Sequence, residues 1–217
     1  PCAGGAVYSP AITDFIFMVD GISRMFLTGP NVIKEITGET ITDEDLGGAK
    51  VHNFTSGVAH FFAKTEAESF AQIKRLLTFL PNSNREKPPV NYSGDPMERA
   101  NPRLLEIVPI EGKRPYNVVK VIEEIMDDHD FFEVQQYWAK NIVVGFARMH
   151  GHPVGVIANQ PSLLAGTLDI NASDKASRFI RFCDCFNIPL LTLVDTPAFL
   201  PGKSQEFGGI IRHGAKI

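Results

Sequence analysis

The sequence lacks any long apolar run, because nothing in its 217 residues approaches the ~20 apolar residues of a membrane-spanning helix. It also lacks a surplus of positive charge, since its formal net charge is −4. A nucleic-acid-binding protein needs a basic face that neutralises phosphates, so the charge argues against that class. The hydrophobic content of 44% and the charged content of 21% are typical of a soluble globular protein.

Cysteine is scarce, with three residues in the chain. Cys183 and Cys185 lie two apart in an apolar stretch, and Cys2 is distant. This pattern favours buried, reduced thiols. The alternative is a metal pair completed by His213 or His150, but a single C-x-C is a weak signal.

Several catalytic motifs are missing. The sequence has no G-x-S-x-G, H-E-x-x-H, P-loop or G-x-G-x-x-G. His52 and His60 lie near Ser56-Gly57, but no acid has an obvious place to orient a Ser/His pair. The acidic run at 127–130 is more typical of a solvated helix end than of a metal cluster, so we predict no metal site.

Two ordered regions flank a looser one. Residues 1–80 contain apolar strand patterns at 15–19 and 25–27 and helix signals at 31–36, at 42–46 with Thr42 as the cap, and from 65 onward. Residues 81–115 are rich in Pro, Asn, Ser and charge, which indicates a linker.

The third region spans residues 116–217. Asn117 is predicted to cap a helix that ends at Ile125, and 141–148 with 153–158 read as a hairpin. Ser173 is predicted to cap the next helix, which leads to a strand at 188–194, a loop and a final helix. This alternation predicts an α/β fold with a largely parallel sheet that is buried on both faces.

Cys2-Ala3-Gly4-Gly5-Ala6 is the first candidate site. Two adjacent glycines let the backbone approach a ligand and let N–H groups point the same way. Such a turn can hold a developing oxyanion, and a helix that begins at residues 6–8 would add positive potential. The alternative is a tight structural turn.

The second candidate is the terminal loop, which is apolar and suited to line the binding site of a flat ligand. Nearby polar groups are Gln205, Glu206, Arg212 and His213. Arg212 and Lys216, four residues apart, share a helix face. This face is either an anion-binding contact or simply exposed to solvent. Gly208-Gly209 reads either as an oxyanion turn or as a point of close helix packing. The loop consists of Thr196, Pro197, Ala198, Phe199, Leu200, Pro201 and Gly202.

Longer motifs carry a resemblance over the whole chain. They are P-C-A-G-G-A-V-Y-S-P-A (1–11), M-F-L-T-G-P (25–30), S-G-V-A-H-F (56–61), N-I-V-V-G-F-A-R (141–148), V-G-V-I-A-N-Q-P (154–161) and F-L-P-G-x-x-Q-E-x-G-G-I-I-R-H-G-A-K (199–216). With these motifs the chain resembles the carboxyltransferase subunits of biotin-dependent acyl-CoA carboxylases, of the propionyl-CoA carboxylase type.

The resemblance implies parts of two crotonase-like domains built as β-β-α superhelices. Residues 1–80 would belong to the acyl-CoA domain, 81–115 to a linker and 116–217 to the biotin-side domain. The active site would form between domains of two protomers. Gly4 and Gly5 would form a backbone oxyanion hole for a thioester enolate, flanked by Ala3 and Ala6 as substrate-binding residues, and 197–202 would be the biotin-side loop.

The resemblance also implies cofactors and partners. They are biotin carried on a partner protein, CoA as part of the acyl-CoA substrate, and a biotin carboxylase or carboxyl carrier subunit. It further implies a dimer-built hexamer, a cytoplasmic location or the mitochondrial matrix in a eukaryote, and catalysis without a protein base.

Three departures from the family pattern bear on function. The second oxyanion turn of the family lies beyond residue 217, and the chain begins at Pro1, so we expect an internal segment of a longer enzyme. Ala198 stands where the family usually has Gly, and a positive φ there would cost ~1 kcal/mol. Related subunits of methylmalonyl-CoA or glutaconyl-CoA decarboxylases, and a segment that folds or associates without catalysis, stay open as alternatives.

Overall fold

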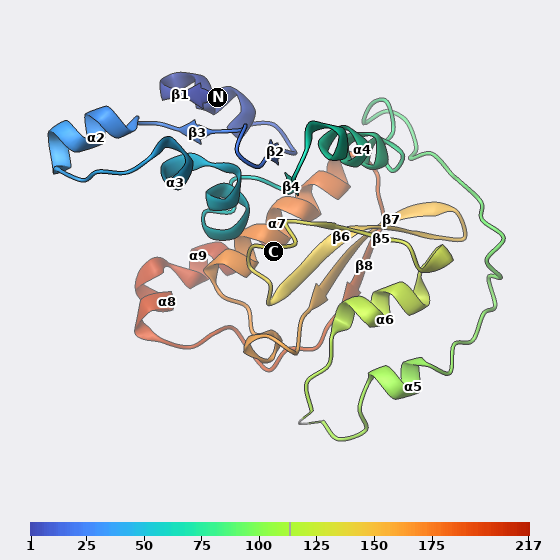
Figure 1. Ribbon diagram of the computed structural model, residues 1–217. Coiled ribbons are helices and arrows are strands. Elements are labelled where there is room, and N and C mark those ends of the chain that lie inside the picture. The colour runs from blue at the N-terminus through green and yellow to red at the C-terminus, as the bar shows by residue number, and fades with distance from the viewer. Residues whose placement is uncertain (113) are drawn as a thin grey trace. The chain divides into compact units, whose positions relative to one another are not determined.

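The computed structural model describes residues 1–112 and 114–217, which form a mixture of helices and strands (Figure 1). These residues divide into two compact units. Unit 1 comprises Pro1–Arg75 and Gln135–Trp138, and unit 2 comprises Leu76–Val134 and Ala139–Ile217. Helix α4 (Glu66–Leu77), predicted from residue 65 onward, contains the point of division. The domain boundaries proposed from the sequence stay a prediction for the longer protein.

Unit 1 is built from two pairs of short parallel strands connected by short helices. Its core contains Val7, Ile16, Met18, Met25, Ala49 and Ala59. The elements are β1 (Cys2–Ala3), η1 (Gly4–Val7), α1 (Tyr8–Ala11), β2 (Phe17–Val19), β3 (Met25–Phe26), α2 (Pro30–Thr37), α3 (Asp43–Gly47), the π-helix η2 (Val51–Thr55) and β4 (Phe61–Ala63).

The strand pairs of unit 1 place its turns. Cys2 pairs with Met25 and Ala3 with Phe26, while Phe17–Val19 pairs in register with Phe61–Ala63. The predicted cap of α3 is confirmed, because the Thr42 side chain accepts the N–H of Asp45 at 3.0 Å.

Unit 2 surrounds a four-stranded sheet of order β5-β6-β7-β8. Figure 1 shows the sheet in yellow to red with its helices around it. The elements are α5 (Leu104–Ile107), α6 (Val118–Ile125), η3 (Asp127–His129), β5 (Phe131–Val134), β6 (Ile142–Met149), β7 (His152–Asn159), η4 (Leu164–Gly166), α7 (Ile170–Cys185), β8 (Leu190–Leu193), α8 (Lys203–Gly208) and α9 (Ile210–Gly214).

The largely parallel sheet predicted from the sequence is wrong. β6 runs antiparallel to both of its neighbours, β5 and β7, and β8 is parallel to its neighbour β7. The reason is the turn at 150–151, which is too short to join parallel strands, whereas α7 supplies the crossover from β7 to β8. The order β6-β7-α7-β8 is thus a β-β-α unit.

Burial on both faces is as predicted for the central strands β6 and β7, whereas β8 is exposed or half-buried at every residue. On one face Val143 and Val156 pack against Ile122 of α6. On the other face the Phe146 ring lies 5.0 Å from the ring of Phe179 in α7. Strands covered on both sides read as continuous apolar runs, which is what the sequence shows at 142–147.

Helix α7 begins earlier than the sequence suggested. Its cap is Asp169, whose carboxylate accepts the N–H of Ala172 at 2.8 Å. Ser173 lies inside the helix, where its hydroxyl donates back to the Asp169 carbonyl. Ser173 as the cap was therefore wrong. Asn117 does cap α6 as predicted, accepting the N–H of Val119 at 3.0 Å. Within 1–112 and 114–217, no helix is long and apolar enough to cross a membrane.

Candidate functional site

The Gly4–Gly5 turn follows strand β1 directly. Ala3 is extended, Gly4 has φ +64° in the left-handed region, and Gly5 continues the turn η1. The first N–H groups of a helical turn have no acceptor within it, so they can be directed at a ligand. Helix α1 does follow this turn, but its four residues are too few for a strong dipole, so the donors themselves must supply the stabilisation.

Space lies in front of both glycines. A Cβ added to Gly4 or Gly5 would meet no described atom within 4 Å. Ala3 and Ala6 beside them are exposed, whereas Val7 is buried in the core of unit 1 and anchors the turn. Gly4 is therefore needed for its backbone angle and not for crowding, and the turn has room for an oxygen atom of a ligand.

The terminal loop belongs to unit 2, and the glycine turn to unit 1. The loop is fixed by a parallel bridge between Phe199 and Leu168. The N–H of Leu200 donates to the Leu168 carbonyl at 2.8 Å, and the N–H of Leu168 donates to the Ala198 carbonyl at 3.3 Å. These bonds hold the middle of the loop as extended backbone.

A pocket of about 460 Å³ lies beside this loop, against α8 and α9. Its lining is apolar apart from one acid. The residues are Phe199, Glu206, Ile210, Ile211, Gly214 and Ala215. Phe199 joins the predicted loop to the pocket, while nothing places Pro197, Pro201 or Gly202 in its wall.

The expected strain at Ala198 is absent. Positive φ angles of non-glycine residues occur at eight described positions, and Ala198 is not among them. The Leu168 bridge keeps this part of the loop extended, a conformation that alanine adopts without cost. The loop is therefore not displaced on account of its alanine.

The carboxyl ends of β7 and β8 carry a polar network that the sequence analysis missed. Asn159 at the end of β7 donates to the Gly166 carbonyl at 2.9 Å and accepts the N–H of Asp195 at 3.3 Å. The Tyr116 hydroxyl donates to the Asp195 carboxylate at 2.8 Å, and burial with this contact raises the pKa of Tyr116 to about 12. The signal was the N-Q-P end of the 154–161 motif, read only as resemblance.

The polar groups of the last helix have structural partners. Asp174 of α7 receives Lys216 Nζ and His213 Nδ1, each at 2.8 Å. Despite its burial, these contacts hold the pKa of Asp174 below its usual range. Arg212 donates to the Gly208 carbonyl at 3.1 Å, so both predicted cations, Arg212 and Lys216, have partners within unit 2. A Cβ on Gly208 would meet Ile170 at 2.5 Å, which favours the close-packing interpretation.

The cysteines are partly as predicted. All three are free thiols, Cys183 is buried with its pKa raised to about 12, and Cys2 is half-buried. Cys185 is exposed, so the prediction of a buried thiol is wrong there. Among the described residues no group of three or more His, Cys, Asp or Glu side chains could hold a metal ion.

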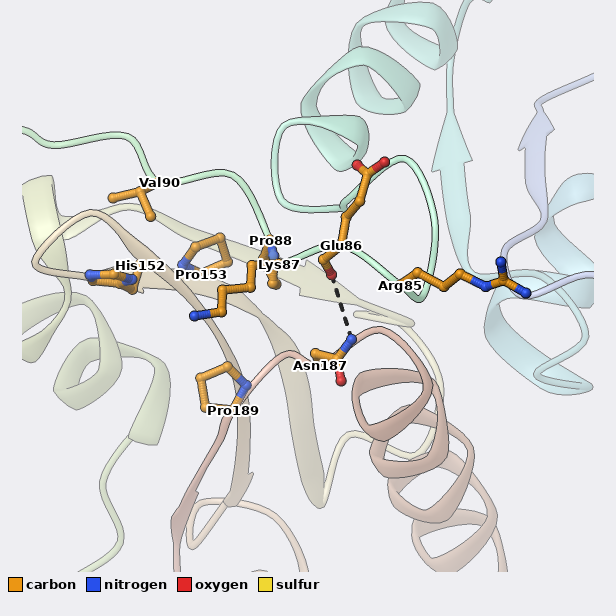
Figure 2. A pocket seen from close by; sticks show the side chains of 9 residues that line it. All are labelled: Arg85, Glu86, Lys87, Pro88, Val90, His152, Pro153, Asn187 and Pro189. Carbon is orange, nitrogen blue, oxygen red and sulfur yellow. Dashed lines mark hydrogen bonds between the residues drawn. The ribbon is translucent and has the colours of Figure 1, made fainter.

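A second pocket of about 460 Å³ lies at the opposite end of the sheet (Figure 2). His152 and Pro153 begin β7, and Pro189 precedes β8, so the pocket lies at the amino ends of the parallel strands. Asn187 closes it by donating to the carbonyl of Asn84 at 2.9 Å and to that of Glu86 at 3.5 Å. Ligands of α/β sheets usually bind at the carboxyl ends, so this pocket lies apart from the candidate site.

The whole chain, residues 1–217, matches the family model described as carboxyl transferase domain. With its glycine turn, its β-β-α unit and this match, the chain belongs to the carboxyl transferase domain family. The resemblance stated from the motifs is confirmed.

Individual relatives carry two kinds of name. The chain is 57% identical to the methylmalonyl-CoA decarboxylase subunit alpha of Veillonella parvula and 52% identical to the mitochondrial propionyl-CoA carboxylase beta chain of Homo sapiens. Both matches cover 100% of this chain, with 43% and 40% of the relatives' own lengths. The chain thus spans about two-fifths of the curated relatives it matches.

A solved structure confirms the fold. The crystal structure of the transcarboxylase 12S hexamer, with hydrolysed methylmalonyl-CoA bound, superposes with a TM-score of 0.96 at 53% identity. The match covers 100% of this chain and 42% of that chain. The predicted crotonase-like α/β fold is therefore correct.

Proposed function

We propose that the longer protein containing this chain is a biotin-dependent carboxyltransferase. It moves CO2 between carboxybiotin and the α-carbon of a short acyl-CoA, with propionyl-CoA favoured. The observation that carries the proposal is the Gly4–Gly5 turn, with its left-handed Gly4 and its open front. Relatives named for propionyl-CoA carboxylation and methylmalonyl-CoA decarboxylation support the substrate class.

The backbone of the glycine turn performs the electrostatic part of the reaction. When the α-carbon of an acyl-CoA loses its proton, negative charge develops on the thioester oxygen. N–H groups that already point at that oxygen stabilise the charge without reorganising. Ala3 and Ala6 flank these donors with small side chains, which leaves room for the thioester.

The pocket beside Phe199 fits the second reactant. A fused ring with an aliphatic arm is largely apolar, as are Phe199, Ile210 and Ile211 in the pocket wall. Biotin carried on a partner protein supplies the CO2 and the group that takes the α-proton. The residues at 197–202 then form the biotin-side loop, whose extended backbone is held by Leu168.

The partners follow from this chemistry. Biotin must be carboxylated elsewhere, so we propose a biotin carboxylase or carboxyl carrier subunit as a partner. The transcarboxylase 12S relative assembles as a hexamer, which supports an oligomer of this protein too. We place the enzyme in the cytoplasm, or in the mitochondrial matrix if the source is a eukaryote.

The test uses the full-length protein and follows carboxyl exchange between methylmalonyl-CoA or malonyl-CoA and free biotin. Gly5→Pro removes one N–H at a position in the first helical turn, where proline is tolerated. Gly5→Ala is the matched control, because it keeps the N–H and adds a Cβ into open space. We expect exchange to fall about 10²–10³-fold in Gly5→Pro and to persist in Gly5→Ala.

No exchange by a folded, oligomeric wild-type protein would reject the carboxyltransferase proposal. Equal loss in both Gly5 variants would reject the role of the Gly5 N–H. The faster acyl-CoA identifies the substrate.

A decarboxylase complex is the second candidate, because the 57% identity to a methylmalonyl-CoA decarboxylase subunit equals that to a propionyl-CoA carboxylase subunit. There the same turn would act in the reverse direction, with a membrane partner that pumps sodium. Purification from the native source discriminates: a soluble biotin carboxylase supports the first candidate, and a membrane subunit with sodium-stimulated decarboxylation supports the second. A segment that only associates would scatter light as an oligomer without exchange activity.

A further inference from the structure

The His52 side chain in η2 lies between a backbone carbonyl and a hydroxyl. Its Nε2 is 2.6 Å from the Met25 carbonyl oxygen, and its Nδ1 is 2.8 Å from Ser56 Oγ. A carbonyl oxygen only accepts, so Nε2 carries a proton, and the Ser56 hydroxyl is the hydrogen-bond partner of Nδ1. The ring is thereby held from both sides in one orientation.

Met25 begins β3, the strand that pairs with β1 and so supports the glycine turn. Its carbonyl lies on the side of β3 that faces away from β1. In a parallel ladder, successive carbonyls of a strand point alternately to opposite sides. Cys2 donates to the Arg24 carbonyl at 2.8 Å, so the next carbonyl, that of Met25, points away from β1. His52 supplies the donor for this oxygen on the side where β1 cannot.

The surroundings of Met25 make this donor matter. Met25 is buried. A Cβ added to Gly47 would lie 2.0 Å from the Met25 carbonyl oxygen, so the backbone of α3 approaches this oxygen closely. Because the hydrogen bond is partly buried, water would replace the lost donor only incompletely. The backbone of β3 would then shift, and its partner Cys2–Ala3 leads directly into Gly4.

The turn that carries Ser56 is fixed on its other side as well. The Gly57 carbonyl accepts Gln135 Nε2 at 2.7 Å, and the Tyr137 ring stacks on Phe54 of η2 at 4.4 Å. All of these residues belong to unit 1. Helix η2 thus offers His52 a rigid base from which to hold β3.

We propose that His52 is a positioning residue for the Gly4–Gly5 oxyanion turn and that Ser56 orients its ring. The inference rests on the proposed carboxyltransferase function. His52 acts through the β3–β1 ladder and does not touch the acyl-CoA. Its loss should therefore weaken transition-state stabilisation more than substrate binding, because the misplaced donors matter most when charge develops.

The test measures carboxyl exchange by the full-length protein and its variants His52→Leu, His52→Gln and Ser56→Ala. Glutamine places an N–H donor near the position of Nε2, whereas leucine does not. His129→Leu is the matched control, since His129 also contacts a backbone carbonyl, that of Glu123 at 2.9 Å, but in unit 2. We expect kcat to fall about 10–100-fold in His52→Leu with KM within about threefold, and to recover mostly in His52→Gln.

Ligand affinity gives a second measurement. A CoA analogue with a nitronate in place of the enolate should lose about tenfold or more in affinity to His52→Leu, and an unreactive CoA thioester less than threefold. If His52→Leu does not fold, Ser56→Ala decides, because Ser56 is exposed and its removal frees the ring at the loss of one further contact, the N–H of Val58 at 3.4 Å. For Ser56→Ala we expect a fall of kcat of several-fold.

Outcomes separate the two proposals. If the wild-type protein shows neither exchange nor a preference for the nitronate, the proposed function fails. If the wild-type protein is active and His52→Leu keeps its kcat per folded molecule, the positioning role is wrong. It is also wrong if KM of His52→Leu rises as much as its kcat falls. The positioning role is equally wrong if His52→Gln behaves as His52→Leu does, or if Ser56→Ala leaves kcat unchanged.

Discussion

At the scale of single residues, Gly4 and Gly5 are neighbours that the structure uses differently. Gly4 has φ +64°, an angle that costs a residue with a Cβ about 1 kcal/mol, whereas Gly5 has no such angle. We expect Gly4→Ala to lower the unfolding free energy by about 1 kcal/mol and Gly5→Ala to change it by less than about 0.5 kcal/mol. Urea unfolding of both variants measures the difference, and equal effects would contradict it.

Ala198 does not have the positive φ that the glycine of the family at this position suggested. With a positive φ there, Ala198→Gly would be neutral or stabilising, but the backbone is not left-handed. Glycine instead adds freedom to the unfolded chain, so we expect Ala198→Gly to lower stability by about 0.4–1 kcal/mol. Thermal unfolding should show a fall in Tm of a few degrees. An unchanged or raised Tm would mean that the loop prefers glycine after all.

At the scale of secondary-structure elements, helix α7 is capped by Asp169 and not by Ser173, the cap predicted from the sequence. Asp169 caps the helix through Ala172 and also receives the side-chain amide of Asn141 at 3.3 Å. We expect Asp169→Ala to cost about 1–2 kcal/mol and Asp169→Asn clearly less, because asparagine also caps. Ser173→Ala serves as the comparison and should cost less than Asp169→Ala. Denaturant midpoints of the three variants decide the order.

Local signals predicted elements well and their pairing less well. The caps Thr42 and Asn117 and the hairpin at 141–158 could be recognised because each depends on neighbouring residues. The antiparallel order of β5, β6 and β7 could not, since alternating strands and helices fit several topologies. The glycine turn was found from Gly4–Gly5, and His52 was noted beside Ser56, which it contacts at 2.8 Å. Its contact with the Met25 carbonyl could not be predicted, because Met25 is 27 residues away.

At the scale of the whole molecule, the buried Lys175 and the half-buried Glu133 give stability a pH dependence. Lys175 is 1% exposed, and its Nζ donates to the Ile142 carbonyl at 2.9 Å. Burial lowers the pKa of Lys175 to about 8 and raises that of Glu133 to about 7, although each charge favours the other. The folded state therefore tolerates neutral forms better than the unfolded chain does.

The two groups stabilise the fold over different pH ranges, because burial shifts their pKa values in opposite directions. The contribution of Glu133 is fully present below its unfolded pKa of about 4.5 and is lost as pH rises through about 7. That of Lys175 is present above 10.5 and is lost as pH falls through about 8. We expect Glu133→Gln to flatten the fall in stability between pH 4.5 and 7, by at most about 3 kcal/mol. Urea midpoints across pH measure it, and an unchanged slope would contradict the assignment to Glu133.

The path of the polypeptide through the two units limits how evolution or an engineer can recombine them. Between β5 and β6 the chain gives four residues, Gln135–Trp138, to unit 1 and then resumes unit 2. A crossover or a split gene placed at residues 75 and 76 would leave unit 1 without the Tyr137 ring that stacks on Phe54. Neither unit is therefore a continuous stretch of sequence, and neither can be exchanged whole by a single cut in the gene.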